Sequence, residues 1–342
     1  MLKRGHLCLC AGALAAYAGM TPSVQAAEPL KIADYLPPTH YLVEVGLKPW
    51  MEEVTKATNG ALTFQHFPSQ QLGKGSEILR VTQTNVAQIG VLGVSFAADK
   101  MELSNVAQLP GMFQSGCEGL RAYMSGVKAG TIATYDFAKN GVHLLYPVVL
   151  PPFQLETRSK QVTGPDDLHG LKIAVATRAG ELLMSKLGAV PMRISSGPDT
   201  YELLSRGTID GYAFALESAV TYDLVPMTGY STSNGSFGGQ VVVTVMNDQT
   251  WKKLDQPAKD AITKASDAAA QRVCERVDQG VANAREKMAA AGTKMVELSP
   301  QAVAGFNAAS ATLADEWAKE LDQRGRPASK VLKEFRDALG TR

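Results

Sequence analysis

The stretch of sequence that decides the fold begins at residue 170 and reads Gly170-Leu171-Lys172-Ile173-Ala174-Val175. This run predicts a short strand. The elements predicted after it are a helix, a strand, a helix and a strand, over residues 179–187, 190–194, 199–206 and 209–214. Short strands that alternate with helices predict an α/β fold with mostly parallel sheets.

The same alternation occurs on both sides of this stretch. Upstream, we expect strands at 30–33, 61–67, 87–94 and 142–149, with helices at 41–58 and 75–84. Downstream, we expect a β-rich segment at 239–247, a long helix at 256–291, a helix at 300–324 and a short helix up to residue 339. The long helix exceeds the usual ~11–12 residues, so it either bends or spans more than one lobe.

Two blocks of alternating strands and helices predict two lobes. A chain of 342 residues is long enough for two lobes, each of roughly 100–200 residues. We place lobe I at residues 27–148 plus about 238–278, and lobe II at residues 149–237 plus about 279–342.

The first 26 residues have the pattern of a secretory signal peptide. Lys3 and Arg4 precede a short apolar run over 7–20, and the segment ends with Val24-Gln25-Ala26. A membrane anchor is the alternative, but the run is shorter than the ~20 residues that a span needs. We therefore expect cleavage after Ala26 and export of a mature chain that is soluble.

Charge and cysteine content narrow the classes of function. The chain has 34 lysine and arginine residues against 33 acidic ones, and this balance gives no reason to expect a nucleic-acid partner. Two cysteines remain after the signal peptide, Cys117 and Cys274. Export permits a disulfide between them, and two buried thiols fit the sequence equally well.

A search for catalytic motifs favours a protein without catalysis, metal or cofactor. The histidines fit no H-E-x-x-H pattern, the cysteines no C-x-x-C pattern, and the serines no G-x-S-x-G pattern. Gly73-Lys74-Gly75-Ser76 lacks the glycine spacing of a phosphate-binding loop, so we interpret it as a loop that leads into a helix.

Several short motifs resemble those of one protein family. Asp167-Leu168-His169-Gly170-Leu171-Lys172-Ile173 is similar to the D-L-x-G-L-K-I-R segment of the DctP family, the substrate-binding proteins of tripartite ATP-independent periplasmic (TRAP) transporters. Six further motifs follow the family's order: Leu36-Pro37-Pro38-Thr39-His40, Phe67-Pro68-Ser69-Gln70-Gln71-Leu72-Gly73, Leu109-Pro110-Gly111-Met112-Phe113, Leu187-Gly188-Ala189-Val190-Pro191, Gly207-Thr208-Ile209-Asp210-Gly211 and Val245-Met246-Asn247. Together they cover nearly all of the mature chain.

The resemblance implies a two-lobed periplasmic binding protein fold, with hinge strands and a long helix across both lobes. It implies that a small solute binds in the cleft, that the lobes close over it, and that the protein docks on TRAP membrane subunits. We expect a periplasmic protein that binds an organic acid, with aromatic character possible. The alternatives are a neutral or cationic solute, a sensory ligand receptor, and, less in keeping with the motif search, a secreted hydrolase.

One departure from the family pattern concerns the ligand's charge. The arginine that usually follows K-I and pairs with a ligand carboxylate is replaced here by Ala174. Arg178, Arg158 or Lys160 could supply the charge from another angle. Alternatively, the ligand lacks a carboxylate, or the family's role has been lost.

The remaining candidate ligand contacts are aromatic residues and residues at strand ends. Tyr212 and Phe214 share one face of a strand, and Tyr146 and Phe153 lie near the expected first crossover between lobes. Because open α/β sheets bind ligands at strand ends, we add further candidates: His40, Tyr41, Gln71, Glu77, Ser95, Phe96, Asn234 and Phe237. Core packing, turns and caps are the alternative roles for all of these residues.

Overall fold

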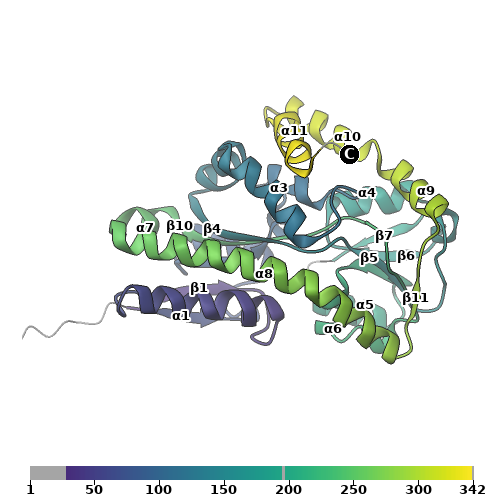
Figure 1. The fold of residues 1–342 in the computed structure, drawn as a ribbon, viewed down its shortest axis with the longest axis horizontal. Coiled ribbons are helices and arrows are strands. Elements are labelled where there is room, and N and C mark those ends of the chain that lie inside the picture. The colour runs from purple at the N-terminus through teal and green to yellow at the C-terminus, as the bar shows by residue number, and fades with distance from the viewer. Residues whose placement is uncertain (1–27, 195–196, 341–342) are drawn as a thin grey trace, which may run out of the picture.

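The computed structural model describes residues 28–194 and 197–340, so the predicted signal peptide lies outside the described residues. Two β-sheets organise these residues (Figure 1). We call the part built on the first sheet lobe I and the part built on the second sheet lobe II. The two-lobed α/β fold expected from the sequence is confirmed.

The sheet of lobe I has the strand order β2-β1-β3-β10-β4. Its strands are β1 (Leu30–Asp34), β2 (Phe64–Phe67), β3 (Ile89–Gly93), β4 (Val142–Val149) and β10 (Val241–Asn247). β3 and β10 are buried along their whole lengths, which fits their apolar sequences and central positions. β10 runs antiparallel to both neighbours, so this sheet is mixed.

The sheet of lobe II has the strand order β11-β9-β5-β8-β6-β7. Its strands are β5 (Gln154–Thr157), β6 (Lys172–Val175), β7 (Val190–Arg193), β8 (Gly211–Phe214), β9 (Tyr230–Thr232) and β11 (Lys294–Val296). The βαβαβ stretch forms the parallel set β7-β6-β8, as its alternation predicts. β5 runs antiparallel to β8 and β9, so this sheet is mixed as well.

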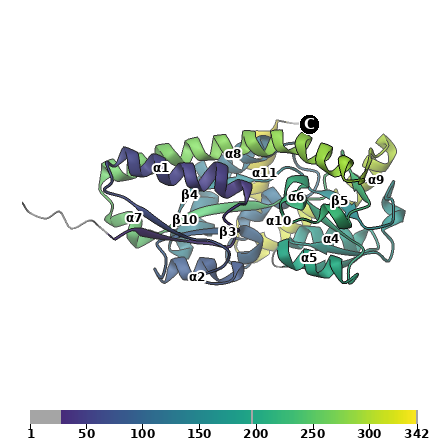
Figure 2. The same ribbon diagram turned by 90° about the horizontal axis from the view of Figure 1, so that it is seen from below.

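Helices cover the sheets of both lobes (Figures 1 and 2). The α-helices other than α8 are α1 (Lys48–Ala57), α2 (Ile78–Gln83), α3 (Gly116–Lys128), α4 (Arg178–Lys186), α5 (Gly197–Ser205), α6 (Leu216–Thr221), α7 (Asp248–Lys253), α9 (Pro300–Ser310), α10 (Leu313–Gln323) and α11 (Ala328–Leu339). Short 3₁₀ turns lie at Gly75–Glu77, Val94–Ala97, Leu103–Gln108, Ala138–Asn140, Pro165–Leu168 and Val225–Met227, and π-helical turns at Val43–Leu47 and Ala133–Phe137. None of the helices in the described residues is long and apolar enough to cross a membrane.

Helix α8 (Gln256–Ala290) runs along both lobes, as the family resemblance implies (Figure 2). Asp255 caps its start by accepting a hydrogen bond from the N–H of Ala258 at 2.9 Å. The helix packs on α1, α3 and β4 in lobe I, and on α6 and β11 in lobe II. A disulfide joins Cys117 of α3 to Cys274 of α8, with 4.8 Å between the Cα atoms.

Two neighbouring chain segments connect the lobes, in addition to α8 and the passage from α9 to α10. The first segment, residues 150–153, links β4 to β5, and the second, residues 233–240, links β9 to β10. They hydrogen-bond to each other, because the N–H of Leu150 donates to the carbonyl of Gln240 and the N–H of Phe153 to that of Gly238, both at 2.9 Å. In place of the expected hinge strands there are thus two paired segments without regular strand structure.

The C-terminal region differs from the expectation in two ways. The helix expected over 300–324 is two helices, α9 and α10, separated at residues 311–312. The chain turns there because α9 stays beside lobe II, whereas α10 packs with α11. Helix α11 returns to lobe I and packs on α3, although we expected residues up to 342 in lobe II. The exact limits of the lobes stay a prediction.

Candidate ligand-binding site

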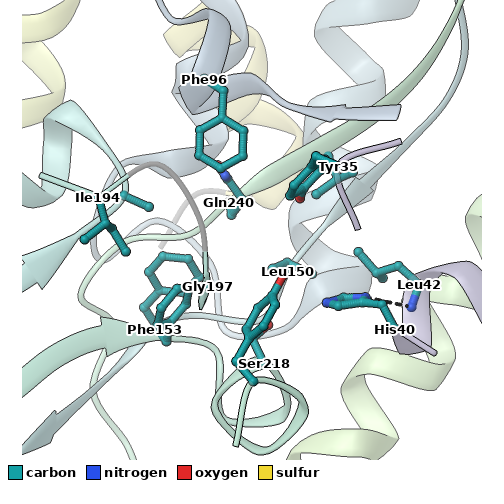
Figure 3. Close-up of a pocket in the computed structure, with 14 residues that line it drawn as sticks. Tyr35, His40, Leu42, Phe96, Leu150, Phe153, Ile194, Gly197, Ser218 and Gln240 are labelled. Atoms are coloured by element: carbon teal, nitrogen blue, oxygen red, sulfur yellow. Dashed lines mark hydrogen bonds between the residues drawn. The ribbon is translucent and has the colours of Figure 1, made fainter. Parts of the chain in front are cut away.

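A small cavity of about 40 Å³ lies between the two lobes, beside the two connecting segments (Figure 3). Its walls are aromatic and aliphatic, with a few neutral polar groups. The lining residues are Tyr35, His40, Leu42, Phe96, Leu150, Phe153, Ala176, Ile194, Gly197, Phe214, Ser218, Tyr222, Gln240 and Val242. In Figure 3, Tyr35 and His40 of lobe I lie on one side of the cavity, and Phe153 and Ile194 on the other.

The aromatic side chains of the cavity contact one another in pairs. Tyr35 directly follows β1 and meets the ring of Phe96 edge to face, with 5.2 Å between ring centroids. Phe214, the last residue of β8, lies 5.9 Å from Phe153 and 6.3 Å from Tyr222 by the same measure. Several of these residues follow or end strands, which is where open α/β sheets hold ligands.

His40 is a neutral hydrogen-bond donor. The N–H of Leu42 donates to Nδ1 of His40 at 3.2 Å, so Nε2 carries the proton of the neutral ring. Burial penalises the charged form and lowers the pKa of His40 to about 3. The imidazole therefore remains uncharged at neutral pH.

Two tyrosine hydroxyls and one serine hydroxyl add to the polar lining. Burial raises the pKa of Tyr35 and that of Tyr222, so both stay protonated at neutral pH. Asp34 contributes to both shifts through its charge, although burial also raises its own pKa. The hydroxyl of Ser218 forms a 3.1 Å hydrogen bond with the hydroxyl of Tyr41.

A chain of amide and hydroxyl groups orients the side chain of Gln240. Its Oε1 accepts a hydrogen bond from Nε2 of Gln108 at 3.0 Å. Its Nε2 donates to Oγ of Ser95 at 2.8 Å. One N–H of the Gln240 amide remains available to a ligand, and the network fixes the amide's orientation.

Ionised side chains lie elsewhere. Among the described residues that line the cavity, none is Lys, Arg, Asp or Glu. The side chain of Arg178 is 65% exposed and pairs with Glu181 at 2.9 Å. The guanidinium of Arg158 donates to the carbonyl of Leu204, and Lys160 is exposed. None of the three cations considered for a carboxylate lies at the cavity.

Four of the other predicted site residues line the cavity, namely His40, Phe96, Phe153 and Phe214. Tyr41 and Ser95 lie one contact away, through Ser218 and Gln240. The remaining candidates have other surroundings. Gln71 is exposed. Oε2 of Glu77 accepts from the N–H of Lys74 at 2.9 Å, and Asn234 bonds the backbone of Leu298.

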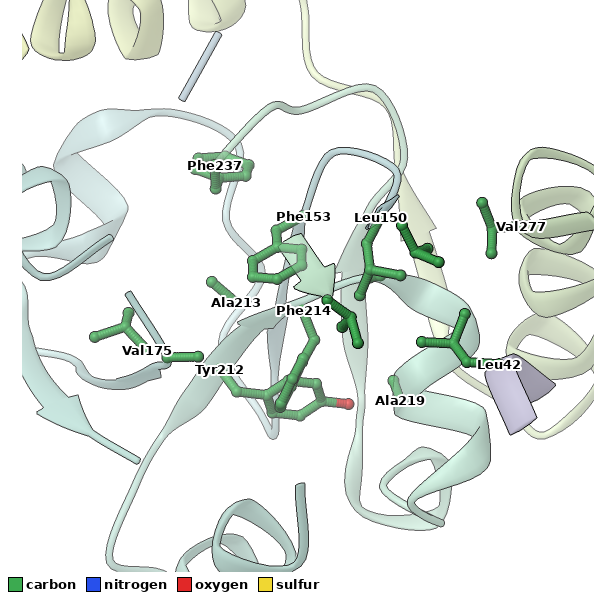
Figure 4. Close-up of a cluster of buried hydrophobic side chains, with 14 of the residues drawn as sticks. Leu42, Leu150, Phe153, Val175, Tyr212, Ala213, Phe214, Ala219, Phe237 and Val277 are labelled. Atoms are coloured by element: carbon green, nitrogen blue, oxygen red, sulfur yellow. The ribbon is translucent and has the colours of Figure 1, made fainter. Parts of the chain in front are cut away.

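The other aromatic candidates are part of the hydrophobic core (Figure 4). The hydroxyl of Tyr212 bonds that of Thr228 at 2.6 Å, so its polar end has a partner inside lobe II. Phe237 packs against Phe306, with 5.0 Å between ring centroids. Tyr146 belongs to the same core cluster. Ala174 is also buried in this core, two residues before Ala176 of the cavity lining.

Sequence reasoning missed Tyr35, Tyr222, Gln240 and Gly197 as cavity residues. A Cβ atom on Gly197 would lie 2.4 Å from the ring of Tyr222, so the glycine leaves room for that ring. Tyr35 carried a usable signal, because it directly follows the first strand. Among the described residues, no group of three or more His, Cys, Asp or Glu side chains could hold a metal ion.

Comparisons with known proteins agree with this architecture. The chain is 26% identical over 231 residues to the C4-dicarboxylate-binding periplasmic protein DctP of Rhodobacter capsulatus, which covers 64% of this chain and 65% of that protein. It is 23% identical over 338 residues to the outer membrane transporter protein TsaT of Comamonas testosteroni, which covers 96% of each.

Solved structures show the same fold. A TRAP solute-binding protein from Rhodoferax ferrireducens, in complex with copurified benzoate, superposes with a TM-score of 0.84 at 22% identity and covers 91% of this chain and 97% of that one. A marine metagenome TRAP solute-binding protein in complex with metahydroxyphenylacetate gives 0.83 at 24% identity, covering 91% and 98%. The sequence profile described as bacterial extracellular solute-binding protein, family 7, matches residues 32–320. The chain therefore belongs to the DctP family of bacterial extracellular solute-binding proteins.

Proposed function

We propose that this protein binds a small aromatic carboxylic acid, about the size of benzoate or phenylacetate, between its lobes and delivers it to TRAP membrane subunits. The observation that carries the proposal is the chemistry of the cavity, where aromatic rings that meet edge to face or at a tilt surround neutral hydrogen-bond donors. Aromatic walls favour a flat ring over an aliphatic chain, because ring pairs add roughly 0.5–1.5 kcal/mol beyond the area that they bury.

Neutral donors can hold a carboxylate when several of them converge. His40 offers its Nε2–H, and Tyr35 and Tyr222 offer hydroxyl groups. Helix α5, nine residues long, begins at Gly197 in the cavity wall, so the positive end of its dipole faces the same space. These groups supply donors and partial positive charge without a lysine or arginine, which supports an anionic ligand despite Ala174.

Some of the structures that share this fold support an aromatic acid, whereas others hold pyroglutamic acid or glucuronate. Those with an aromatic acid hold metahydroxyphenylacetate, benzoate or mandelate. All of these compounds combine one ring with one carboxylate. The cavity of this chain offers rings and donors in the same combination, although those structures are under 25% identical to it.

Ligand entry requires the lobes to move. The cavity of about 40 Å³ is smaller than the ~150 Å³ cavity that holds benzene in an engineered protein core. An aromatic acid therefore enters when the lobes part, and the rings of Phe96, Phe153 and Phe214 repack around it as they close. A hinge at the paired segments 150–153 and 233–240 fits such a motion.

Calorimetric titration of the mature chain against matched compounds tests the proposal. Benzoate and phenylacetate should bind, and cyclohexanecarboxylate, which keeps the charge but loses the ring, should bind about tenfold more weakly. Benzamide, which keeps the ring but loses the charge, should bind at least about tenfold more weakly, because hydrogen bonds to charged groups are the stronger ones. Tighter binding of benzamide would instead assign a neutral aromatic solute, and tighter binding of succinate would contradict the aromatic site.

A matched pair of variants tests whether the ligand binds in this cavity. Phe214→Leu removes a ring from the cavity wall, whereas Phe335→Leu removes a buried ring from the core of lobe I beside Phe113. We expect Phe214→Leu to weaken benzoate binding about tenfold, while Phe335→Leu leaves the affinity unchanged. Equal effects of the two variants would place the ligand elsewhere.

A further inference from the structure

Tyr41 lies directly behind the cavity and contacts two of its polar groups. The residue is 7% exposed and is not part of the cavity lining. Its ring stacks on that of His40, with 4.4 Å between centroids and 27° between planes. Its hydroxyl forms the 3.1 Å hydrogen bond with Oγ of Ser218. Both partners line the cavity.

The two contacts of Tyr41 belong to different lobes. His40 and Tyr41 precede the π-helical turn Val43–Leu47, which leads into α1 of lobe I. Ser218 lies in α6, which follows β8 of lobe II. The hydrogen bond between the two hydroxyls therefore crosses from one lobe to the other.

Polar side chains also surround Tyr41. On its far side is a polar groove, which we define by Thr39, Tyr41, Glu217, Arg276 and Lys287 among its lining residues. In that groove the carboxylate of Glu217 already pairs with Arg276 at 2.6 Å. The adjacent residues of α6 thus divide their roles, because Glu217 binds α8 and Ser218 binds Tyr41.

We propose that Tyr41 is a positioning residue that orients His40 from lobe I and Ser218 from lobe II at once, so that the polar lining of the cavity is completed by closure. The ring contact holds the imidazole of His40 in place beside the cavity. The hydroxyl contact fixes the rotamer of Ser218 and links the lobes. The ligand identity rests on the proposed function, whereas the link between the lobes does not.

A double-label distance measurement tests this role. Spin labels are attached to two cysteines introduced into the mature chain, Lys56→Cys in α1 and Arg206→Cys directly after α5. Both native residues are exposed. The native cysteines of the described chain are bonded to each other, so they do not react with the label. Pulsed electron resonance then gives the closed fraction without ligand, with benzoate and with succinate. In the Tyr41→Phe variant, the ratio of closed to open forms should fall about two- to tenfold. This range corresponds to the loss of one intramolecular hydrogen bond.

Tyr123→Phe is the matched control. The hydroxyl of Tyr123 bonds Oγ of Ser104 at 2.7 Å, and both residues belong to lobe I. Its loss should lower the melting temperature and leave the ratio of closed to open forms unchanged. A merely structural role of Tyr41 predicts the same behaviour for Tyr41→Phe, and that result would overturn the proposal.

A double-variant cycle tests the role of Tyr41 independently of the ligand's identity. Ser218→Ala should lower the ligand-free closed fraction as Tyr41→Phe does. The double variant should have the same closed fraction as either single variant, because all three lack the same hydrogen bond between Tyr41 and Ser218. Additive losses would overturn the proposal. If benzoate leaves the wild-type distances unchanged, the proposed ligand is wrong, and the ligand-free and succinate data still decide the role of Tyr41. A wild-type chain that is never closed under the three conditions would also overturn it.

Discussion

Helix α8 is attached to the two lobes in different ways. On the side of lobe I, a disulfide joins Cys274 to α3, and the carboxylate of Asp278 accepts hydrogen bonds from the first two N–H groups of that helix, at 2.5 and 3.0 Å. Arg272 adds an ion pair to Glu53 of α1 at 2.9 Å. The attachment is covalent, and charge-assisted hydrogen bonds reinforce it.

On the side of lobe II, the attachment of α8 is smaller. Arg276 pairs with Glu217 of α6, and a small apolar cluster joins Leu216 to Ala284 and Met288. One oxygen of Glu217 and one nitrogen of Arg276 are buried without a hydrogen-bond partner, as is one nitrogen of Arg272 on the side of lobe I. We infer that lobe I and α8 move as one body, and that lobe II is the body that swings. Each of the following predictions tests one side of this difference.

The largest effect should come from the disulfide. Cys117→Ser/Cys274→Ser opens a link between residues 157 positions apart, so the free energy of unfolding should fall by about 3–5 kcal/mol, mainly because the unfolded chain gains freedom. Urea unfolding of the oxidised wild type and of the variant measures the difference. The closed fraction should hardly change, because both cysteines belong to the same body. A variant as stable as the wild type would contradict a covalent attachment.

The next largest effect is a loss of folding stability at low pH, which comes from His40 at the boundary between the lobes. The pKa of His40 is about 3 in the folded chain, whereas it is ~6.5 when solvated. Between these values the unfolded chain binds more protons, so the stability is complete above pH 6.5 and falls as the pH decreases. From pH 7 to pH 5 the loss is about 2 kcal/mol.

His40→Gln removes this contribution. The difference in unfolding free energy between wild type and variant, measured at pH 7 and pH 5, isolates it, because the other titrating groups are common to both chains. One of these groups is Asp136, because burial raises the pKa of its carboxyl group to about 6. His40 also lies beside Tyr222 of lobe II, so acid should lower the closed fraction of the wild type. Equal acid sensitivity of the two chains would contradict the buried neutral imidazole.

A smaller loss should follow from Asp278→Ala. The variant leaves the N–H groups of Gly116 and Cys117 at the start of α3 without their acceptor. Such losses at a helix start cost about 1–2 kcal/mol. Urea unfolding measures this cost, and the distance measurement should show no change in the closed fraction. A shift in that fraction would mean that α8 moves relative to lobe I.

Local patterns predicted most individual elements. The strand expected at 142–149 is β4 at the same residues, and the helix expected at 256–291 is α8, which ends one residue earlier. Alternation of apolar residues, helix caps and glycine stops act over a few residues, so the sequence displays them directly. The break at 311–312 and the return of α11 to α3 depend on packing between distant segments, which no local pattern contains.

The cavity was predictable only in part for the same reason. His40, Phe96, Phe153 and Phe214 follow from the rule that ligands bind at strand ends. Gln240 is oriented by Gln108, 132 positions away, and such a contact has no local signal. The charge of the ligand stayed open because the aligned arginine position holds Ala174 and the cavity offers only neutral donors.

The smallest expected effect in stability comes from Gly280→Ala, which acts on the side of lobe II. A Cβ atom at this position would lie 2.0 Å from Oε2 of Glu217 and 2.6 Å from Nη1 of Arg276. Both atoms are ends of flexible side chains, so the ion pair has to shift while the helix remains. Alanine is also the better helix residue by about 1 kcal/mol. The two effects oppose each other, and the free energy of unfolding should change by less than about 1 kcal/mol.

The closed fraction of Gly280→Ala should nevertheless fall about two- to fivefold, because the shifted pair no longer holds α6 against α8. Glu217→Gln is the matched variant, since it weakens the same pair without the gain in helix propensity. It should lower the closed fraction similarly and reduce stability slightly more. If both variants keep the wild-type closed fraction, the pair does not hold lobe II, and the other contacts of α8 with α6 and β11 then carry the attachment, among them the apolar contacts of Leu216 with Ala284 and Met288.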